Sequence, residues 1–193
     1  SPGEWYLDFD TGILYFWPPG TIDENDVFIS SMSTVMLQCS GASNITIKDL
    51  LIEGTQGSAV QVEGSENVIV DGCEIRNVNG DYAIEIDSGS ENGAMNCHIY
   101  NVGGGGFKLS GGDRATLAPS GSYAINNLIH DFGLVYRTYH GGVNVSGVGN
   151  TVAHNEIYNA PHLGMSFSGN EHIIEYNEIY GVAQETHDVG AIY

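Results

Sequence analysis

The sequence predicts an all-β protein folded as a parallel β-helix of about seven rungs with an N-terminal β-hairpin cap. Its composition is poor in helix formers, since 27 of the 193 residues are glycine and Asn- and Ser-rich segments are frequent. Apolar and polar residues alternate in short stretches between Gly and Asn corners, as in half-buried strands. The pattern repeats at intervals in the low twenties, which is typical of a β-helix.

The first residues break the repeat. The stretch GEWYLDFDTGILYFWPPG places two aromatic-rich segments around Asp-Thr-Gly and ends in Pro-Pro-Gly, a pattern that favours a hairpin. A β-helix needs its open end covered against edge pairing. We therefore predict a hairpin cap over residues 1–22 and a parallel β-helix over residues 23–193, and we expect further rungs to follow Tyr193.

Three apolar columns define the rungs. The first column is Ile29, Ile52, Ile75, Ile99, Ile129, Ile157 and Ile179. The second consists of apolar pairs two residues apart, which begin at Leu37, Val60, Ile84, Phe107, Val143, Met165 and Ala191. The third is Ile47, Val70, Ala94, Ala124, Val152 and Ile174. Three columns predict three short strands per rung.

The position two residues before the first column predicts a stacked polar corner. It is apolar in the early rungs and becomes Asn127, Asn155 and Asn177 in the last three. Stacked side-chain amides can hydrogen-bond from rung to rung. Cys73 and Cys97 occupy the same position in two middle rungs, and we expect both to be free, buried thiols.

Charge limits the partners. Acidic residues outnumber basic ones 24 to 5, for a net charge of -19, which disfavours nucleic acid and anionic membrane surfaces. No apolar run is long enough to span a bilayer. The three cysteines form no metal-binding spacing. Neutral ligands fit this chain best, and no cofactor or metal is predicted, although the acidic side chains leave calcium as an open alternative.

Lengthened corners predict a cleft. The corner that follows the first column is long at residues 134–140 and 182–188 and short at Pro161–His162 between them. A further extension covers residues 110–122. His140, His162 and Asp188 occupy equivalent positions on three successive rungs, so their side chains are expected to stack along one edge.

These residues suggest roles in glycoside hydrolysis, which requires two carboxyl groups. We assign Asp188 as one catalytic carboxylate, with Asp131 or Glu185 as the other. The substrate-binding residues that we expect around them are His140, His162, Tyr136, Tyr139, Arg137 and His187.

Several stretches resemble a known group of proteins. SGGDRATLAPSGSYAINNLIHDFG and GVGNTVAHNEIYNAPHLGMSFSGNEHIIEYNEIYGVAQETHDVGAIY, with the N-terminal stretch, are similar to the right-handed parallel β-helix proteins of bacterial polysaccharide-degrading systems. They resemble in particular the β-helical glycoside hydrolase family with fucosidase and xylanase members. The matching positions are His154, His162, His172, Glu175 and Asp188.

The resemblance implies a right-handed helix, a plant or algal polysaccharide as substrate, and a secreted or periplasmic location. Two other functions stay open. A polysaccharide lyase or epimerase would use Arg137, Tyr139 and His140 for charge neutralisation and proton transfer. A non-catalytic carbohydrate-binding or structural β-helix would use none of these groups for turnover. An uncovered last rung would also favour end-to-end self-association.

Overall fold

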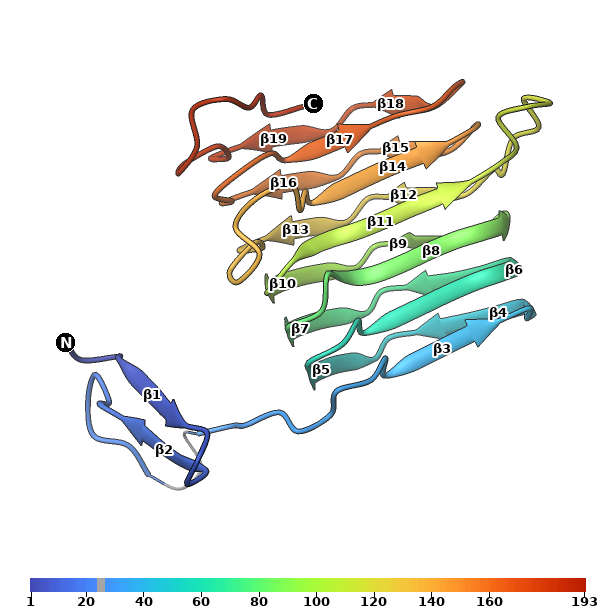
Figure 1. Ribbon diagram of the computed structural model, residues 1–193. Coiled ribbons are helices and arrows are strands. Elements are labelled where there is room, and N and C mark those ends of the chain that lie inside the picture. Colours follow the sequence, from blue (N-terminus) through green and yellow to red (C-terminus); the bar gives the residue numbers. More distant parts are fainter. Residues whose placement is uncertain (24–26) are drawn as a thin grey trace.

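The computed structural model describes residues 1–23 and 27–193 and contains nineteen strands, with no helix among these residues. Most strands lie in stacked coils (Figure 1). The strands are β1 (Trp5–Asp8), β2 (Ile13–Phe16), β3 (Leu37–Ser40), β4 (Ser43–Lys48), β5 (Leu51–Thr55), β6 (Val60–Asp71), β7 (Glu74–Val78), β8 (Tyr82–Ser90), β9 (Gly93–Met95), β10 (His98–Val102), β11 (Gly105–Gly111), β12 (Tyr123–Ile125), β13 (Leu128–His130), β14 (Val143–Gly147), β15 (Thr151–Ala153), β16 (Glu156–Tyr158), β17 (Met165–Phe167), β18 (Ile173–Glu175) and β19 (Glu178–Tyr180).

The coils form a right-handed parallel β-helix with three faces. One face is the six-stranded sheet β5-β7-β10-β13-β16-β19. A second face stacks β3, the first part of β6, β8, β11, β14 and β17, and the third stacks β4, the second part of β6, β9, β12, β15 and β18. The predicted columns are confirmed by the register, in which Ile75 lies opposite Ile52 and Ile99.

The sheet of the first face has six strands, so about six coils are formed where we expected about seven. Ile29 lies in no strand and is 68% exposed. Between Ile29 and β3, the chain forms only a single β-bridge to the next coil, in which Met32 lies opposite Thr55, 23 residues later. At the other end Ile192, rather than Ala191, lies opposite Met165. The first and last predicted rungs are therefore only partly formed.

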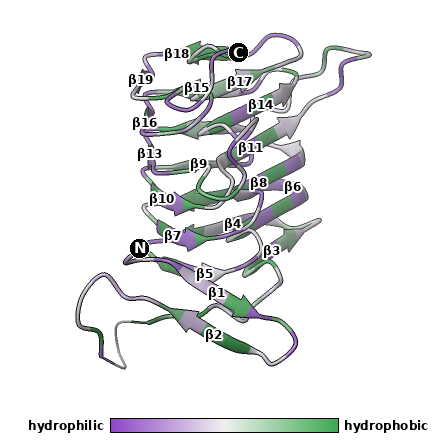
Figure 2. Ribbon diagram, turned by 60° about the vertical axis from the view of Figure 1, so that its left-hand side comes forward, coloured by the Kyte–Doolittle hydropathy of each residue, from purple (hydrophilic) through white to green (hydrophobic). Residues whose placement is uncertain are grey.

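The columns form the core. Side chains from all three faces point inward and are almost completely buried, and Figure 2 shows hydrophobic and hydrophilic residues alternating along β6 and β8. The largest fully buried side chains include Phe107, Phe132, Ile75, Ile84 and Ile99. This burial along every coil is the main stabilising contribution.

The predicted asparagine ladder is confirmed. Asn127 Nδ2 donates to Asn155 Oδ1 and Asn155 Nδ2 donates to Asn177 Oδ1, each over 2.9 Å. Each amide also bonds backbone groups of neighbouring coils. Cys73 and Cys97 are buried and free, as expected.

The corner before the first column needs a left-handed backbone. Asn96, Asn126, His154 and Tyr176 all have φ between 54° and 57° there. Asn tolerates this conformation better than most residues. His154 stacks on Tyr176 with ring centroids 5.0 Å apart, so His154 has a structural role at this corner.

The N-terminal hairpin consists of the antiparallel strands β1 and β2. It is set off from the stacked strands, at the end of an extended connection (Figure 1). Together with residues 22 and 27–30 and with Gln56 and Asn79 of the coils, it borders an apolar cavity of about 800 Å³. Its role as a cap stays a prediction.

Candidate functional site

The lengthened corners lie next to each other. Arg137 of the first donates through Nε to Glu185 Oε2 of the second over 3.0 Å, and a second bond joins Nη2 to Oε1. The backbone N–H of Glu185 also donates to Pro161 O over 3.0 Å. The two long corners, at residues 134–140 and 182–188, are therefore hydrogen-bonded to each other next to the short corner at Pro161.

His162 lies beneath these loops. Its side chain is 6% exposed, and its Nδ1 has no hydrogen-bond partner in the described part of the chain. The Tyr139 ring packs against it with centroids 5.0 Å apart. Burial lowers the pKa of His162, so the imidazole is neutral near pH 7.

The other predicted site residues are spread over this end of the molecule. His140 packs between Tyr136 and Tyr82, with ring centroids 5.2 and 5.4 Å away. His187 and Asp188 are exposed and form no hydrogen bond or ion pair with any described residue. The expected stack of His140, His162 and Asp188 is therefore not formed by direct contacts, and the catalytic role of Asp188 stays a prediction.

Asp131 belongs to a different face. Its Oδ2 lies 2.6 Å from His130 Nδ1, and its Oδ1 accepts a hydrogen bond from Asn159 Nδ2. These contacts hold Asp131 at the end of the β10-β13-β16 sheet. The structure provides no direct contact that joins Asp131 to Asp188 or to Glu185.

A groove runs over the outer surface of the second face. Three neighbouring cavities of about 650, 310 and 670 Å³ form it. Asp81 and Glu85 line both the first and the second, and Ser146 and Ser168 line both the second and the third. The shared residues make the three cavities one continuous groove across several coils.

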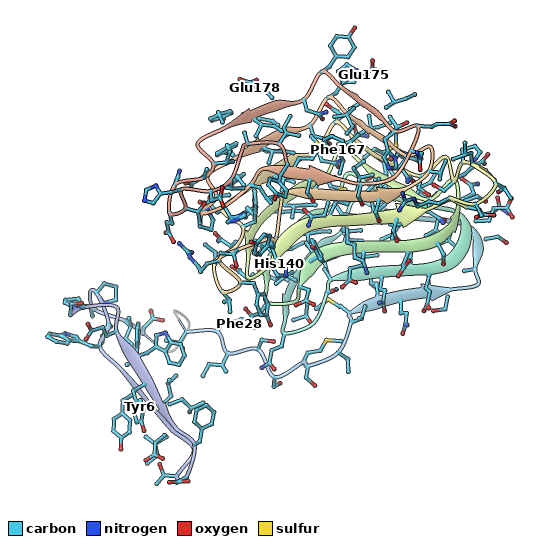
Figure 3. All side chains as sticks on the ribbon, turned by 45° about the horizontal axis from the view of Figure 1, so that its top comes forward. Tyr6, Phe28, His140, Phe167, Glu175 and Glu178 are labelled. Carbon is cyan, nitrogen blue, oxygen red and sulfur yellow. The ribbon has the colours of Figure 1, made fainter. Side chains whose placement is uncertain are left out.

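The predicted loops border this groove. Tyr136 of the 134–140 corner lines the first cavity, and Arg114 of the 110–122 extension lines the third. Figure 3 shows His140 next to the edge of the stacked strands. The loops thus border the groove, but its floor is formed by the strands.

Two carboxylates stand on that floor. Glu85 and Asp87 are two residues apart in β8, so both point outward, with Cα atoms roughly 6.6 Å apart. Glu85 accepts a hydrogen bond from Ser58 Oγ. Asp87 Oδ1 accepts one from Ser110 Oγ over 2.7 Å, and its Oδ2 lies 3.7 Å from Lys108 Nζ.

A polar cluster lies beside them. Asn144 Nδ2 donates to the Tyr82 hydroxyl over 2.8 Å, and Asn144 Oδ1 accepts from the Gly141 N–H over 3.0 Å. Burial raises the pKa of Tyr82, so its hydroxyl is protonated near pH 7. This cluster fixes the Tyr82 ring next to His140 at the groove wall.

An aromatic column on the first face is less suited to sugars. The rings of Tyr100, His130, Tyr158 and Tyr180 stack with centroids 4.7–5.3 Å apart and interplanar angles of 8–9°. Pyranose rings bind aromatic side chains through the ring faces. Because neighbouring rings already cover most of these faces, the column is better explained as structural stacking.

The family comparison agrees with this architecture. The family model described as right handed beta helix region matches residues 35–136, which is 102 of the 193 residues. The chain belongs to this family. No curated protein and no solved structure matches this β-helix protein. The matched segment includes Glu85, Asp87 and Lys108, whereas Asp188 lies outside it.

Within residues 1–23 and 27–193, no group of three or more His, Cys, Asp or Glu side chains is arranged to hold a metal ion. No helix that could span a membrane occurs in the described part of the chain. The expectation of no cofactor, with calcium as an open alternative, stays a prediction.

The groove floor was not predicted, because the apolar columns mark only the side chains that point inward. The signal was the residue between the two members of each apolar pair in the second column, which must point outward. In four successive coils these residues are Gln61, Glu85, Lys108 and Asn144. Polar side chains recurring at one outward position indicate a surface that could bind a ligand.

Proposed function

We propose that this β-helix protein binds a polysaccharide along the groove over β6, β8, β11 and β14 and hydrolyses its glycosidic bonds. The observation that carries the proposal is a continuous groove with two carboxylates on the same side of one strand. Hydroxyl and amide groups from adjacent coils line the same surface and could bind sugar hydroxyls.

The chemistry needs one carboxylic acid to protonate the leaving oxygen and one carboxylate to act as nucleophile or base. Asp87 fits the second role, since Ser110 and Lys108 fix its orientation. Glu85 fits the acid role because its side chain is longer than that of Asp87 and points to the same side of β8, two residues away. Inversion requires carboxyl groups roughly 6.5–9.5 Å apart and retention roughly 5–5.5 Å, and rotation about the side-chain bonds of Glu85 allows either.

Our sequence-based assignment placed the chemistry at Asp188, Asp131 and Glu185. None of these three residues lines the cavities of the groove. The engaged guanidinium of Arg137 is also less available for a lyase reaction. Asp188 stays a candidate that the same experiment examines. The secreted or periplasmic location remains part of the proposal.

The test is reducing-sugar release from a panel of neutral and uronic-acid polysaccharides. We expect turnover by the unchanged protein and a loss of at least about a hundredfold in Glu85→Gln and Asp87→Asn. Glu66→Gln, which changes an exposed carboxylate outside the groove, is the matched control.

Two results would contradict the proposal. Loss of turnover in Asp188→Asn, with Glu85→Gln unaffected, would return the active site to the loops. Binding without release of sugar by any form would make the chain a carbohydrate-binding module.

A further inference from the structure

The basic residues of this chain are few and nearly all paired. Four of the five form ion pairs, namely Lys48–Asp71, Arg76–Glu53, Lys108–Asp87 and Arg137–Glu185. Arg114 is the exception, because its side chain forms no ion pair or hydrogen bond with any described residue. An unpaired guanidinium in a chain of net charge -19 needs an explanation.

Arg114 lies on a loop that is held in shape by hydrogen bonds of its neighbour Asp113. Asp113 Oδ1 accepts a hydrogen bond from the Ala115 N–H and Asp113 Oδ2 accepts one from Thr116 Oγ1, each over 2.8 Å. The Asp113 N–H donates to Ala118 O over 2.9 Å. Asp113 is thus occupied within the loop and is not paired with its neighbour Arg114.

The third cavity of the groove, of about 670 Å³, is where Arg114 lies. Ser146 and Ser168, from two adjacent coils, line the same cavity, and their hydroxyl groups form no hydrogen bond with described residues. The one carboxylate in the lining, Asp87, has Lys108 and Ser110 as partners. Among the residues that the structure describes, the cavity therefore presents one cation and two hydroxyl donors without partners.

We propose that Arg114, with Ser146 and Ser168, binds one anionic substituent, a carboxylate or a sulfate ester, on an otherwise neutral glycan. The proposal rests on the proposed function, since it concerns one end of the same groove. A guanidinium binds such groups through paired N–H donors. The overall negative charge disfavours polymers that carry an anion on every residue.

The first experiment needs no knowledge of the polysaccharide. The ¹⁵N-labelled protein is titrated with glucuronate, with sodium sulfate and with glucose at constant ionic strength, and the Arg114 Nε–H signal is followed by NMR. We expect saturable shifts with glucuronate or sulfate and none with glucose. Arg114→Gln should abolish the accompanying shifts of Gly111 and Ser146, whereas Lys48→Gln should retain them.

The second experiment uses oligosaccharides from whichever polymer is bound. Versions without a substituent, with one glucuronic acid and with one sulfate are compared by calorimetry, which distinguishes the two anions. Arg114→Gln should weaken binding of a charged version about tenfold or more, as expected for a lost charge-assisted bond. Binding of the neutral version should stay within about twofold, and Arg114→Lys should recover part of the loss.

Absent shifts with both anions, or identical shifts in Arg114→Gln, would overturn the proposal. Equal affinity of the unchanged protein for neutral and charged oligosaccharides would also overturn it while leaving the proposed hydrolysis intact. Anion binding at Arg114 without turnover of any polymer would support the subsite and contradict the hydrolase.

Discussion

Replacing Asn155 by alanine should be among the most damaging single changes to this fold. The residue is 1% exposed, and its side chain takes part in four hydrogen bonds. It accepts from the N–H and the Nδ2 of Asn127, and it donates to Asn177 Oδ1 and Ala124 O, all over 2.9–3.0 Å. The substitution leaves several of these partners buried and unpaired.

The magnitude follows from these bonds. An ordinary protein hydrogen bond contributes about 1 kcal/mol net, and a buried group left unpaired costs about 1–3 kcal/mol. Four bonds in a buried corner therefore give a loss of about 3–6 kcal/mol in the free energy of unfolding. Gln184 offers a control, since its side-chain amide donates to Asn159 Oδ1 and Gly181 O but is exposed, and its backbone is not left-handed. Gln184→Ala should cost less than about 1 kcal/mol.

Urea unfolding followed by far-ultraviolet circular dichroism measures both. Tryptophan fluorescence is unsuitable, because Trp5 and Trp17 lie at the hairpin and not in the coils. Similar losses for Asn155→Ala and Gln184→Ala would refute the reasoning, since they would show that burial of the ladder has no energetic importance.

Three further outcomes are expected. Burial raises the pKa of the Cys97 thiol to about 12, so iodoacetamide near pH 8 should label the half-buried Cys39 at least about tenfold faster, as measured by peptide mass spectrometry; equal rates would contradict this. Burial lowers the pKa of His162 in the folded protein, so on acidification the unfolded chain binds a proton at this residue before the folded chain does. The free energy of unfolding that depends on neutral His162 is therefore fully present above about pH 6.5 and decreases as the pH falls. His162→Gln should reduce this fall in urea midpoints, and an unchanged pH dependence would be evidence against it. Glu185→Gln should cost under about 1 kcal/mol, because the pair with Arg137 is exposed, yet amide exchange of residues 182–188 should increase; unchanged exchange would mean that the pair does not fasten the loops.

The repeat could be predicted because each coil must bury apolar side chains at the same inward positions as its neighbours. Ile75, Ile99 and Ile129 share one register, and that spacing is visible in the sequence. The ladder of Asn155 and its neighbours followed for the same reason. The prediction that Ile29 belongs to a rung was wrong because an end position has a neighbouring coil on one side only. There the right spacing does not guarantee strand pairing.

The site was harder to predict because loop conformation depends on contacts distant in sequence. The spacing identified which corners grow, but not that Arg137 and Glu185, 48 residues apart, would fasten two of them together. The outward residues of β8 could have been found from alternation alone. Their partners Ser58 and Ser110 depend on the stacking of neighbouring coils.

The proposed function requires the groove on the second face, and not the pair of loops, to bind the glycan. Amide hydrogen exchange with and without an oligosaccharide from the panel distinguishes these two surfaces. Binding in the groove should give new protection in residues 81–87, 108–111 and 143–147. Protection confined to residues 134–140 and 182–188, with the groove strands unchanged, would contradict it.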